Sequence, residues 1–419
     1  YESRACKRYL SHFRIDPKTQ DKKKYKQLIQ KCEEEHLDIL ETIEREYNIT
    51  IACAYSDHIN DPQDVWSDVT YLRMYMDPPT HALTYIQKEQ PPYLLFDVAK
   101  SNMYPGKKEN TELWNMLSDI IPYYQKVFGI DGVRIDMGHA LHEKLVAKML
   151  QKARAIDDDI CFIAEEMDVR NDYISKQKGY NLLLGNGFSE ESRIEEGRLN
   201  AFYYNARHLH LPVFAMSENH DSARSSAKEG GRIYSDMSIL INLFMPNGVP
   251  FLNSGQEFYE VQPMNLGVDC TSDERWRLPS SDYRHGKLAL FDSFAFLYNE
   301  DRIIDMLKEV MPIRKKYLNE IMTYSKNVPA WFDSPNDRCL GSWFIKEDRV
   351  LLMVANTNLY EEASYNVHFI NIADKISFIP KVCKDRFSTH KDYKNSEIFE
   401  NYGIRIHMKA GEVKLIVVK

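Results

Sequence analysis

The sequence lacks the features that mark several classes of protein. Its 419 residues contain no signal peptide and no long apolar run, so we expect no membrane-spanning segment. Lysine and arginine (54) are outnumbered by aspartate and glutamate (62), which gives a net charge of -8. Because no broad basic surface is expected to attract phosphate groups, we predict that nucleic acid is not a partner.

Closely spaced cysteine pairs are also missing. The seven cysteines are scattered along the chain, none forms a C-x-x-C pair, and the number is odd. This pattern argues against both a zinc site and a disulfide framework, and we predict neither a metal nor a cofactor. Scattered single cysteines suit a reducing compartment, which predicts a cytoplasmic location.

The middle of the chain alternates between two patterns. Short apolar runs of strand length are separated by stretches with helical periodicity. The strands are expected at 131–136, 160–165, 211–217 and 248–255. The helices are expected at 110–127, 141–155 and 233–245. Apolar strands that alternate with helices predict a buried parallel sheet and therefore the α/β class.

The two ends of the chain differ from the middle. Apolar residues at helical spacing predict a helix over 21–47, and a strand is expected at 48–55. Another helical region is expected at 286–317. From about Pro329 onward the pattern changes to a period of two residues, as in VKLIVV (413–418). That period predicts antiparallel strands, which we interpret as a C-terminal β-sandwich domain.

Acidic residues repeatedly fall at the carboxyl ends of the predicted parallel strands. Asp136 ends GVRID, Glu165 and Glu166 end FIAEE, and Asp221 ends SENHD. Catalytic groups gather at this edge in α/β barrels. A buried carboxylate is costly unless it is paired or used, and capping the next helix is the alternative for any single one. Three such positions on successive units favour a catalytic site.

Two carboxylates that flank one bond define glycoside hydrolysis. One is a nucleophile or base, and the other is an acid whose pKa is raised. Arg134 lies two residues before Asp136, on the same face of an extended strand. An arginine partner favours an ionised carboxylate, which a nucleophile needs. Glu165 follows three apolar residues (162–164), and apolar surroundings favour the protonated acid.

The segments GVRID, FIAEE, SENHD and GVPFLNSGQE occur in the order and spacing found in the α-amylase family, glycoside hydrolase family thirteen. The chain resembles that family, and the resemblance implies a (β/α)8 TIM barrel and retaining chemistry on α-glucans. It implies that Asp136 is the nucleophile, Glu165 the acid/base and Asp221 the stabiliser of the transition state. The residues that it implies for substrate binding are Arg134, His139, Asn219 and His220.

Longer segments resemble a narrower group, the bacterial maltosyltransferases, which move maltosyl units between α-1,4-glucans. Among them are PPYLLFDVAKSNMYPGK (91–107) and VQPMNLGVD (261–269). His220 departs from that group and matches the commoner amylase pattern. The resemblance therefore implies a maltooligosaccharide or α-glucan substrate and leaves both transfer and hydrolysis open.

The first motif of the α-amylase family, an Asp-x-x-x-Asn-His at strand three, has no match here. The resemblance then assigns 1–90 to an insertion after barrel strand three, 91–325 to strands four to eight, and 326–419 to the C-terminal β-domain. Because five strands cannot close a barrel normally, we expect an incomplete barrel. The chain also begins with Tyr1, so we expect a C-terminal fragment, with a missing N-terminal segment or a homo-oligomer as its partner.

Two other classes are compatible with the same residues. A catalytically inactive, glucan-binding fragment would follow from the incomplete barrel. A metal-dependent hydrolase also places Asp, Glu and His at strand ends, but no His-x-His occurs at a first strand. The leading prediction remains a retaining enzyme, in which the carboxyl groups of Asp136 and Glu165 lie about 5–5.5 Å apart.

Overall fold

The computed structural model describes residues 22–37, 39–47, 74–76, 105–138, 141–265, 271–275, 277–289, 296–333, 338–391, 394–399 and 402–419. These residues fall into two compact units. The strand expected at 48–55 lies outside the described residues. No helix in the described part of the chain is long and apolar enough to cross a membrane.

The described residues of the first unit are mainly helical. Two helices, α3 (Lys22–Glu35) and α4 (Ile39–Tyr47), stand where one was expected, and His36 between them has a left-handed φ of +52°. Helix α6 (Thr111–Phe128) packs with α7 (Glu143–Arg154). A small core shared by Trp114, Leu145 and Met74 stabilises this unit.

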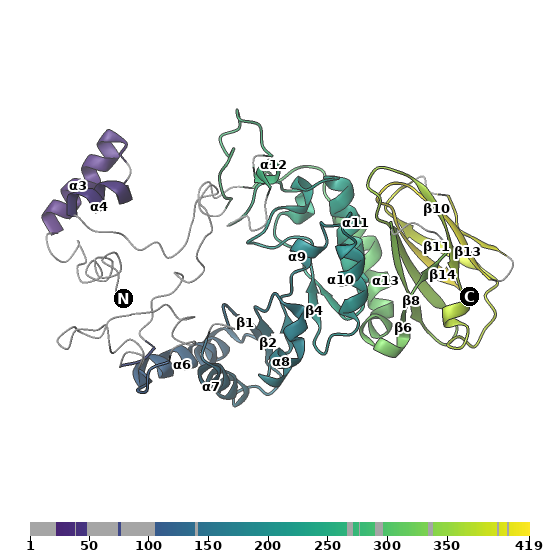
Figure 1. Cartoon of the computed structure of the whole chain (residues 1–419), viewed down its shortest axis with the longest axis horizontal. Helices are drawn as coiled ribbons and strands as arrows, with labels where there is room; N and C mark the ends of the chain where they lie inside the picture. The colour runs from purple at the N-terminus through teal and green to yellow at the C-terminus, as the bar shows by residue number, and fades with distance from the viewer. Residues whose placement is uncertain are drawn as a thin grey trace. The chain divides into compact units, whose positions relative to one another are not determined.

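The second unit contains a parallel sheet of five strands. In chain order these are β1 (Gly132–Ile135), β2 (Cys161–Ala164), β3 (Leu182–Leu183), β4 (Val213–Ala215) and β5 (Gly248–Pro250). Their spatial order is the same as their chain order, and Figure 1 shows β1 beside β2. The predicted parallel sheet is confirmed. Among the described residues β1 and β5 are its free edges, so no closed barrel is seen there.

The helices of the second unit are mostly short. They are α8 (Asp172–Gln177), α9 (Gly187–Glu190), α10 (Arg198–Ala206), α11 (Arg232–Leu243), α12 (Ser272–Arg275) and α13 (Ile304–Met322). Of the helix expected over 286–317, α13 confirms the part from Ile304 onward, whereas the described residues 286–289 and 296–303 are not helical. The described residues immediately before α13 form turns and irregular chain.

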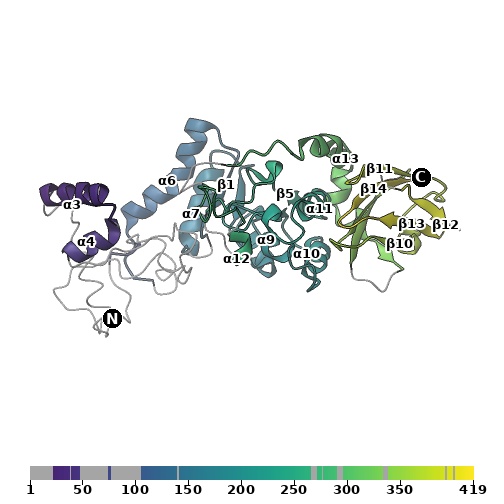
Figure 2. The same ribbon diagram turned by 90° about the horizontal axis from the view of Figure 1, so that it is seen from above.

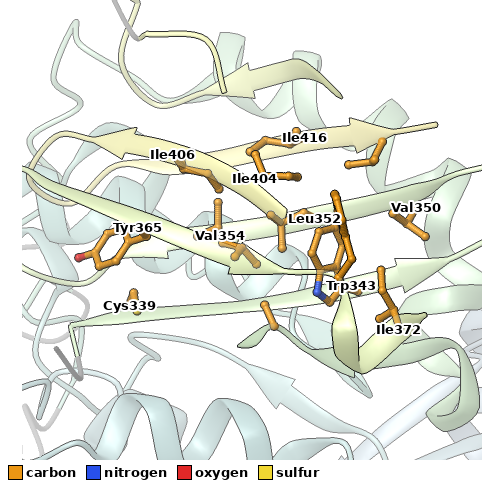
Figure 3. Packing of buried hydrophobic residues seen from close by; sticks show 14 of the residues in the cluster. Cys339, Trp343, Val350, Leu352, Val354, Tyr365, Ile372, Ile404, Ile406 and Ile416 are labelled. Carbon is orange, nitrogen blue, oxygen red and sulfur yellow. The ribbon is translucent and has the colours of Figure 1, made fainter. Parts of the chain in front are cut away.

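Two antiparallel sheets follow α13 and form the predicted sandwich. One has the order β11 (Cys383–Ser388), β14 (Val413–Val418), β9 (Val350–Asn356), β8 (Cys339–Ile345) and β6 (Asn327–Pro329). The other has the order β12 (Glu397–Phe399), β13 (Gly403–Met408), β10 (Ala363–His368) and β7 (Trp331–Phe332). Figure 3 shows Trp343, Leu352 and Ile404 packed together in the core of this domain.

The five-stranded sheet of the sandwich is covered on both of its faces. Every residue of β8, β9 and β14 is buried, whereas an alternating pattern alone predicts one face in water. Helix α11 contacts β9 and β14 as well as β5, and α13 contacts β8. Figure 2 shows α11 and α13 next to the strands of this domain. The second face is therefore buried against helices that precede the sandwich in the chain.

Candidate active site

One arginine joins two carboxylates at the carboxyl edge of the parallel sheet. Asp136 directly follows β1 and Glu165 directly follows β2, and the two strands are paired in register. Arg134 places Nη1 2.9 Å from Asp136 Oδ1 and Nη2 2.6 Å from Glu165 Oε1. The Asp136 side chain is 60% exposed and that of Glu165 is 8% exposed. This arginine cluster (Arg134, Asp136 and Glu165) thus has one open and one enclosed carboxylate.

A tight turn after β1 holds the arginine cluster in place. Met137 has a left-handed φ of +49°, which is uncommon for a residue with a side chain, and its N–H donates to Glu165 Oε2. A Cβ on the next residue, Gly138, would lie 2.5 Å from the hydroxyl of Tyr180. Tyr180 is itself buried, so a residue larger than glycine at position 138 would clash with its hydroxyl.

The environment of Glu165 favours its protonated form. Burial raises the pKa of Glu165 above its ordinary value, and the nearby charge of Asp136 adds to the rise. The Met137 N–H and the charge of Arg134 lower the same pKa, but burial is the largest effect. A carboxyl group that keeps its proton at higher pH is suited to act as a general acid.

Both carboxylates are held by the guanidinium of Arg134. Asp136 acts on Glu165 through its charge and through a side-chain interaction, and both effects raise the pKa of Glu165. The separation of about 5–5.5 Å between the two carboxyl groups, which a retaining glycosidase needs, stays a prediction.

Three predicted site residues lie in a turn after β4, here called the 219–221 turn. Asn219 Oδ1 accepts the N–H of Asp221 at 3.0 Å, and Asn219 N–H donates to Ser222 Oγ at 2.9 Å. Asp221 Oδ1 accepts from Asn265 Nδ2 at 2.8 Å, and Asp221 Oδ2 is 3.2 Å from His220 Nε2. Asn219 is buried and shapes the turn, while the His220 side chain remains 36% exposed.

A buried ion pair fixes the loop that carries this turn. Glu218 and Arg224 are both fully buried, with Oε1 and Nη1 2.8 Å apart. Glu218 also accepts from Asn253 Nδ2 at 3.0 Å. Arg224 donates to the carbonyls of Ser254 and Gln262 at 2.8 and 2.9 Å. Buried charges are tolerated when they are paired and hydrogen-bonded, and these bonds tie the loop after β4 to the loop after β5.

Glu191 is another fully buried carboxylate in this unit. Its Oε2 accepts from Asn242 Nδ2 at 2.9 Å. Burial raises the pKa of Glu191 to about 8, while the Asn242 hydrogen bond and the charge of Lys228 oppose the rise. Lys228 donates to the carbonyls of Phe188 and Ser217 at 2.6 and 2.8 Å. This network supports the chain where it leaves β4, just before the 219–221 turn.

The arginine cluster and the 219–221 turn both follow carboxyl ends of the parallel strands, and the catalytic roles of their members stay predictions. His139 lies outside the described residues. Glu166, which follows Glu165 in the same motif and could replace it as the acid, accepts the N–H of Asp168 at 3.0 Å and so stabilises a local turn. Among the residues that the structure describes, no three His, Cys, Asp or Glu side chains are arranged to hold a metal ion.

Sequence reasoning missed the partners that hold the site residues. Arg224, Asn253 and Asn265 lie close to quoted motifs or within them, but nothing local marks them as partners of Glu218 and Asp221. The one available signal is a charged residue, Arg224, inside the small-residue segment SARSSA (222–227). Side-chain pairs contributed by separate loops are set by the fold, and a single motif does not reveal them.

These features define an α/β protein with carboxylates along one sheet edge and a C-terminal β-sandwich, and solved structures share this fold. An α-amylase from Geobacillus thermoleovorans, complexed with acarbose, has a TM-score of 0.53 at 14% identity and covers 74% of this chain. A debranching enzyme from Nostoc punctiforme, soaked with acarbose, has a TM-score of 0.53 at 13% identity and covers 91%. Amy13B of Eubacterium rectale has a TM-score of 0.51 at 15% identity and covers 74%.

In the other direction, this chain spans 64% of the Geobacillus amylase, 78% of the Nostoc enzyme and 64% of Amy13B. It therefore spans slightly less than two thirds of the length of two of them. No protein-family model and no curated protein matches the sequence. At these identities, the likeness establishes a common fold with enzymes that act on glycosides.

Proposed function

We propose that this protein is a retaining enzyme of the α-amylase type that acts on α-1,4-glucans. The observation that carries the proposal is the arginine cluster, in which one guanidinium contacts both an open and an enclosed carboxylate. The raised pKa of Glu165 supports its role as the acid. The exposed carboxylate of Asp136 supports its role as the nucleophile.

The proposed reaction proceeds in two steps. Asp136 attacks the anomeric carbon while Glu165 protonates the departing glycosidic oxygen, and a covalent glycosyl-enzyme forms. Glu165, now ionised, then takes a proton from water or from a sugar hydroxyl that attacks the same carbon. Asp221, held by Asn265 and His220, stabilises the oxocarbenium-like transition state. The sugar ring enters between Asp136 and Glu165.

The substrate class is inferred from the sequence resemblance together with the shared fold. Structures with this fold were solved with maltose and maltotriose bound, as well as with acarbose. We propose a maltooligosaccharide or longer α-glucan as the substrate. The maltosyltransferase-like segments favour transfer to a sugar hydroxyl, whereas His220 favours hydrolysis by water. The experiment below distinguishes these two acceptors.

The experiment compares the protein with an Asp136→Asn variant. Each is incubated with maltotetraose, and the products are separated by length. Products both shorter and longer than the substrate, absent from the variant, would establish glucan transfer. Shorter products alone, again absent from the variant, would establish hydrolysis. Equal product formation by the protein and the variant would overturn the assignment of the nucleophile.

A second candidate function is a non-catalytic glucan-binding protein. The open sheet favours it, because β1 and β5 are unpaired edges among the described residues. Maltotetraose binding without any product from either protein would establish this function in place of the first.

A further inference from the structure

An open pocket lies on the β-sandwich, and the described residues that line it include none of the candidate active-site residues. Its volume is about 630 Å³, within the range of small-molecule sites. The residues that line it are Trp331, Phe332, Asp333, His368, Phe369, Ile370, Ala373 and Tyr402. We call it the Trp331 pocket. Three of its apolar members, Trp331, Ile370 and Tyr402, are more than half exposed (56%, 64% and 67%).

The strand pairing places a row of rings across one face of the four-stranded sheet. Trp331 of β7 is paired with His368 of β10, and their ring centres are 6.0 Å apart. His368 is also 6.0 Å from the ring of Phe399 in β12. The next residue of β7, Phe332, instead packs against the sandwich core. Trp331 is therefore directed to the outer face by the alternation of side chains along the strand.

The polar groups of the pocket narrow the class of ligand. Among the described residues that line it, the titratable side chains are those of Asp333, His368 and Tyr402, and none is a lysine or an arginine. The Asp333 side chain is 68% exposed, and its Oδ2 is 3.7 Å from His368 Nε2. A pocket whose described lining carries no fixed cation is unsuited to phosphates or nucleic acid. One carboxylate and one imidazole supply hydrogen-bond partners for hydroxyl groups.

Exposed aromatic rings next to hydroxyl-binding groups match the two kinds of surface on a sugar ring. The C–H faces of a pyranose are apolar and pack on Trp or Tyr, while its rim of hydroxyls needs donors and acceptors. Tryptophan and tyrosine are favoured where one side of a ligand is apolar and the other is wet. Exposed apolar patches rimmed by polar groups commonly mark binding grooves.

We propose that the Trp331 pocket is a second carbohydrate-binding site, which holds an α-glucan chain by stacking on Trp331 and Tyr402. Asp333 and His368 hydrogen-bond to the hydroxyls of the held sugar. The choice of α-glucan rests on the proposed function, which supplies that polymer as the substrate. The role of the site is to keep a long glucan bound to the protein while another part of the same glucan molecule reacts at the active site.

The first test measures binding in the Asp136→Asn background, so that the glucan is not consumed. Affinity electrophoresis of the full chain in gels containing amylose gives the dissociation constant. Trp331→Ala and Tyr402→Ala are each expected to weaken amylose binding about tenfold, because each removes one stacking ring. Tyr360→Ala is the matched control, since Tyr360 is equally exposed (67%) in the same domain but lies outside the pocket lining.

The second test separates this site from the active site. In the otherwise unchanged protein, Trp331→Ala is expected to raise KM for amylose several-fold and to leave maltotetraose turnover unchanged, because a tetrasaccharide needs only the active site. Unchanged amylose binding in Trp331→Ala, or equal weakening in Tyr360→Ala, would overturn the proposed site. Weakened amylose binding in a protein that makes no products would instead keep the site and overturn the proposed catalytic function.

Discussion

At the scale of single residues, one arginine contacts both of the carboxylates that we propose as nucleophile and acid. A nucleophile has to be ionised and an acid has to be protonated, yet Arg134 contacts both Asp136 and Glu165. Exposure separates their behaviour, because Asp136 is solvated whereas Glu165 is enclosed. Burial is the larger effect on Glu165, and its pKa is raised despite the positive charge beside it.

Replacing the proposed acid tests this assignment. Glu165→Gln is expected to lower kcat on maltotetraose by about a hundredfold or more, as for the loss of a general acid. Glu166→Gln is the matched control, because Glu166 accepts a hydrogen bond from the Asp168 N–H. This variant is expected to leave kcat nearly unchanged. Steady-state rates, with circular dichroism to verify folding, measure both. A larger loss in the Glu166 variant would reassign the acid.

The pH profile tests the role of Arg134. An acid must carry its proton, so the rate is expected to fall as pH rises through the pKa of Glu165. Arg134 lowers that pKa, and Arg134→Met is therefore expected to shift the alkaline limb to higher pH while reducing kcat. The measurement is kcat/KM against pH for the parent and the variant. An alkaline limb that moves to lower pH would contradict this account.

At the scale of elements, apolar runs predicted most strands and missed the shortest ones. Strands β1, β2, β4 and β5 lie within the predicted ranges. The pair of residues in β3 is too short to show any periodicity, and it is a strand because it completes the ladder between β2 and β4. The helix expected from 286 begins only at Ile304, since composition alone does not mark that start.

The loops after β4 and β5 depend on each other through Arg224. Glu218→Gln and Arg224→Met are each expected to lower the free energy of unfolding by about 3–5 kcal/mol, because each leaves a buried charge without its partner. The double variant is expected to lose less than the sum of the two. Urea unfolding of the four proteins measures the coupling. Strict additivity would show that the two side chains act independently.

At the scale of the whole molecule, helix α11 packs against both the parallel sheet and the sandwich. Both faces of β8, β9 and β14 are buried, and the rings of Phe244 and Phe344, 6.2 Å apart, join the end of α11 to β8. The parallel sheet and the sandwich therefore share packing within the second unit. A substitution that disturbs this shared packing is therefore expected to destabilise both the parallel sheet and the sandwich.

The buried Glu191 gives the molecule a pH-dependent stability. The folded chain holds its proton up to a pKa of about 8, whereas the unfolded chain releases it near 4.5. The folded state thus binds more protons between these values, and stability falls as pH rises through this window. Glu191→Gln is expected to match the parent near pH 4.5 and to exceed it by roughly a few kcal/mol at pH 8. Urea unfolding at both pH values measures this, and equal slopes would contradict it.

The sequence by itself indicated four of the five parallel strands, the class of the C-terminal domain and the positions of Asp136, Glu165 and Asp221 after predicted strands. These features depend on residues near one another in the chain, where periodicity and motif spacing are visible. Only the tertiary structure decided that Arg134 bridges two carboxylates, that Arg224 pairs with Glu218, and that the sandwich is buried on both faces. Those features arise from the packing of separate elements, which brings the partners together and removes water from around them.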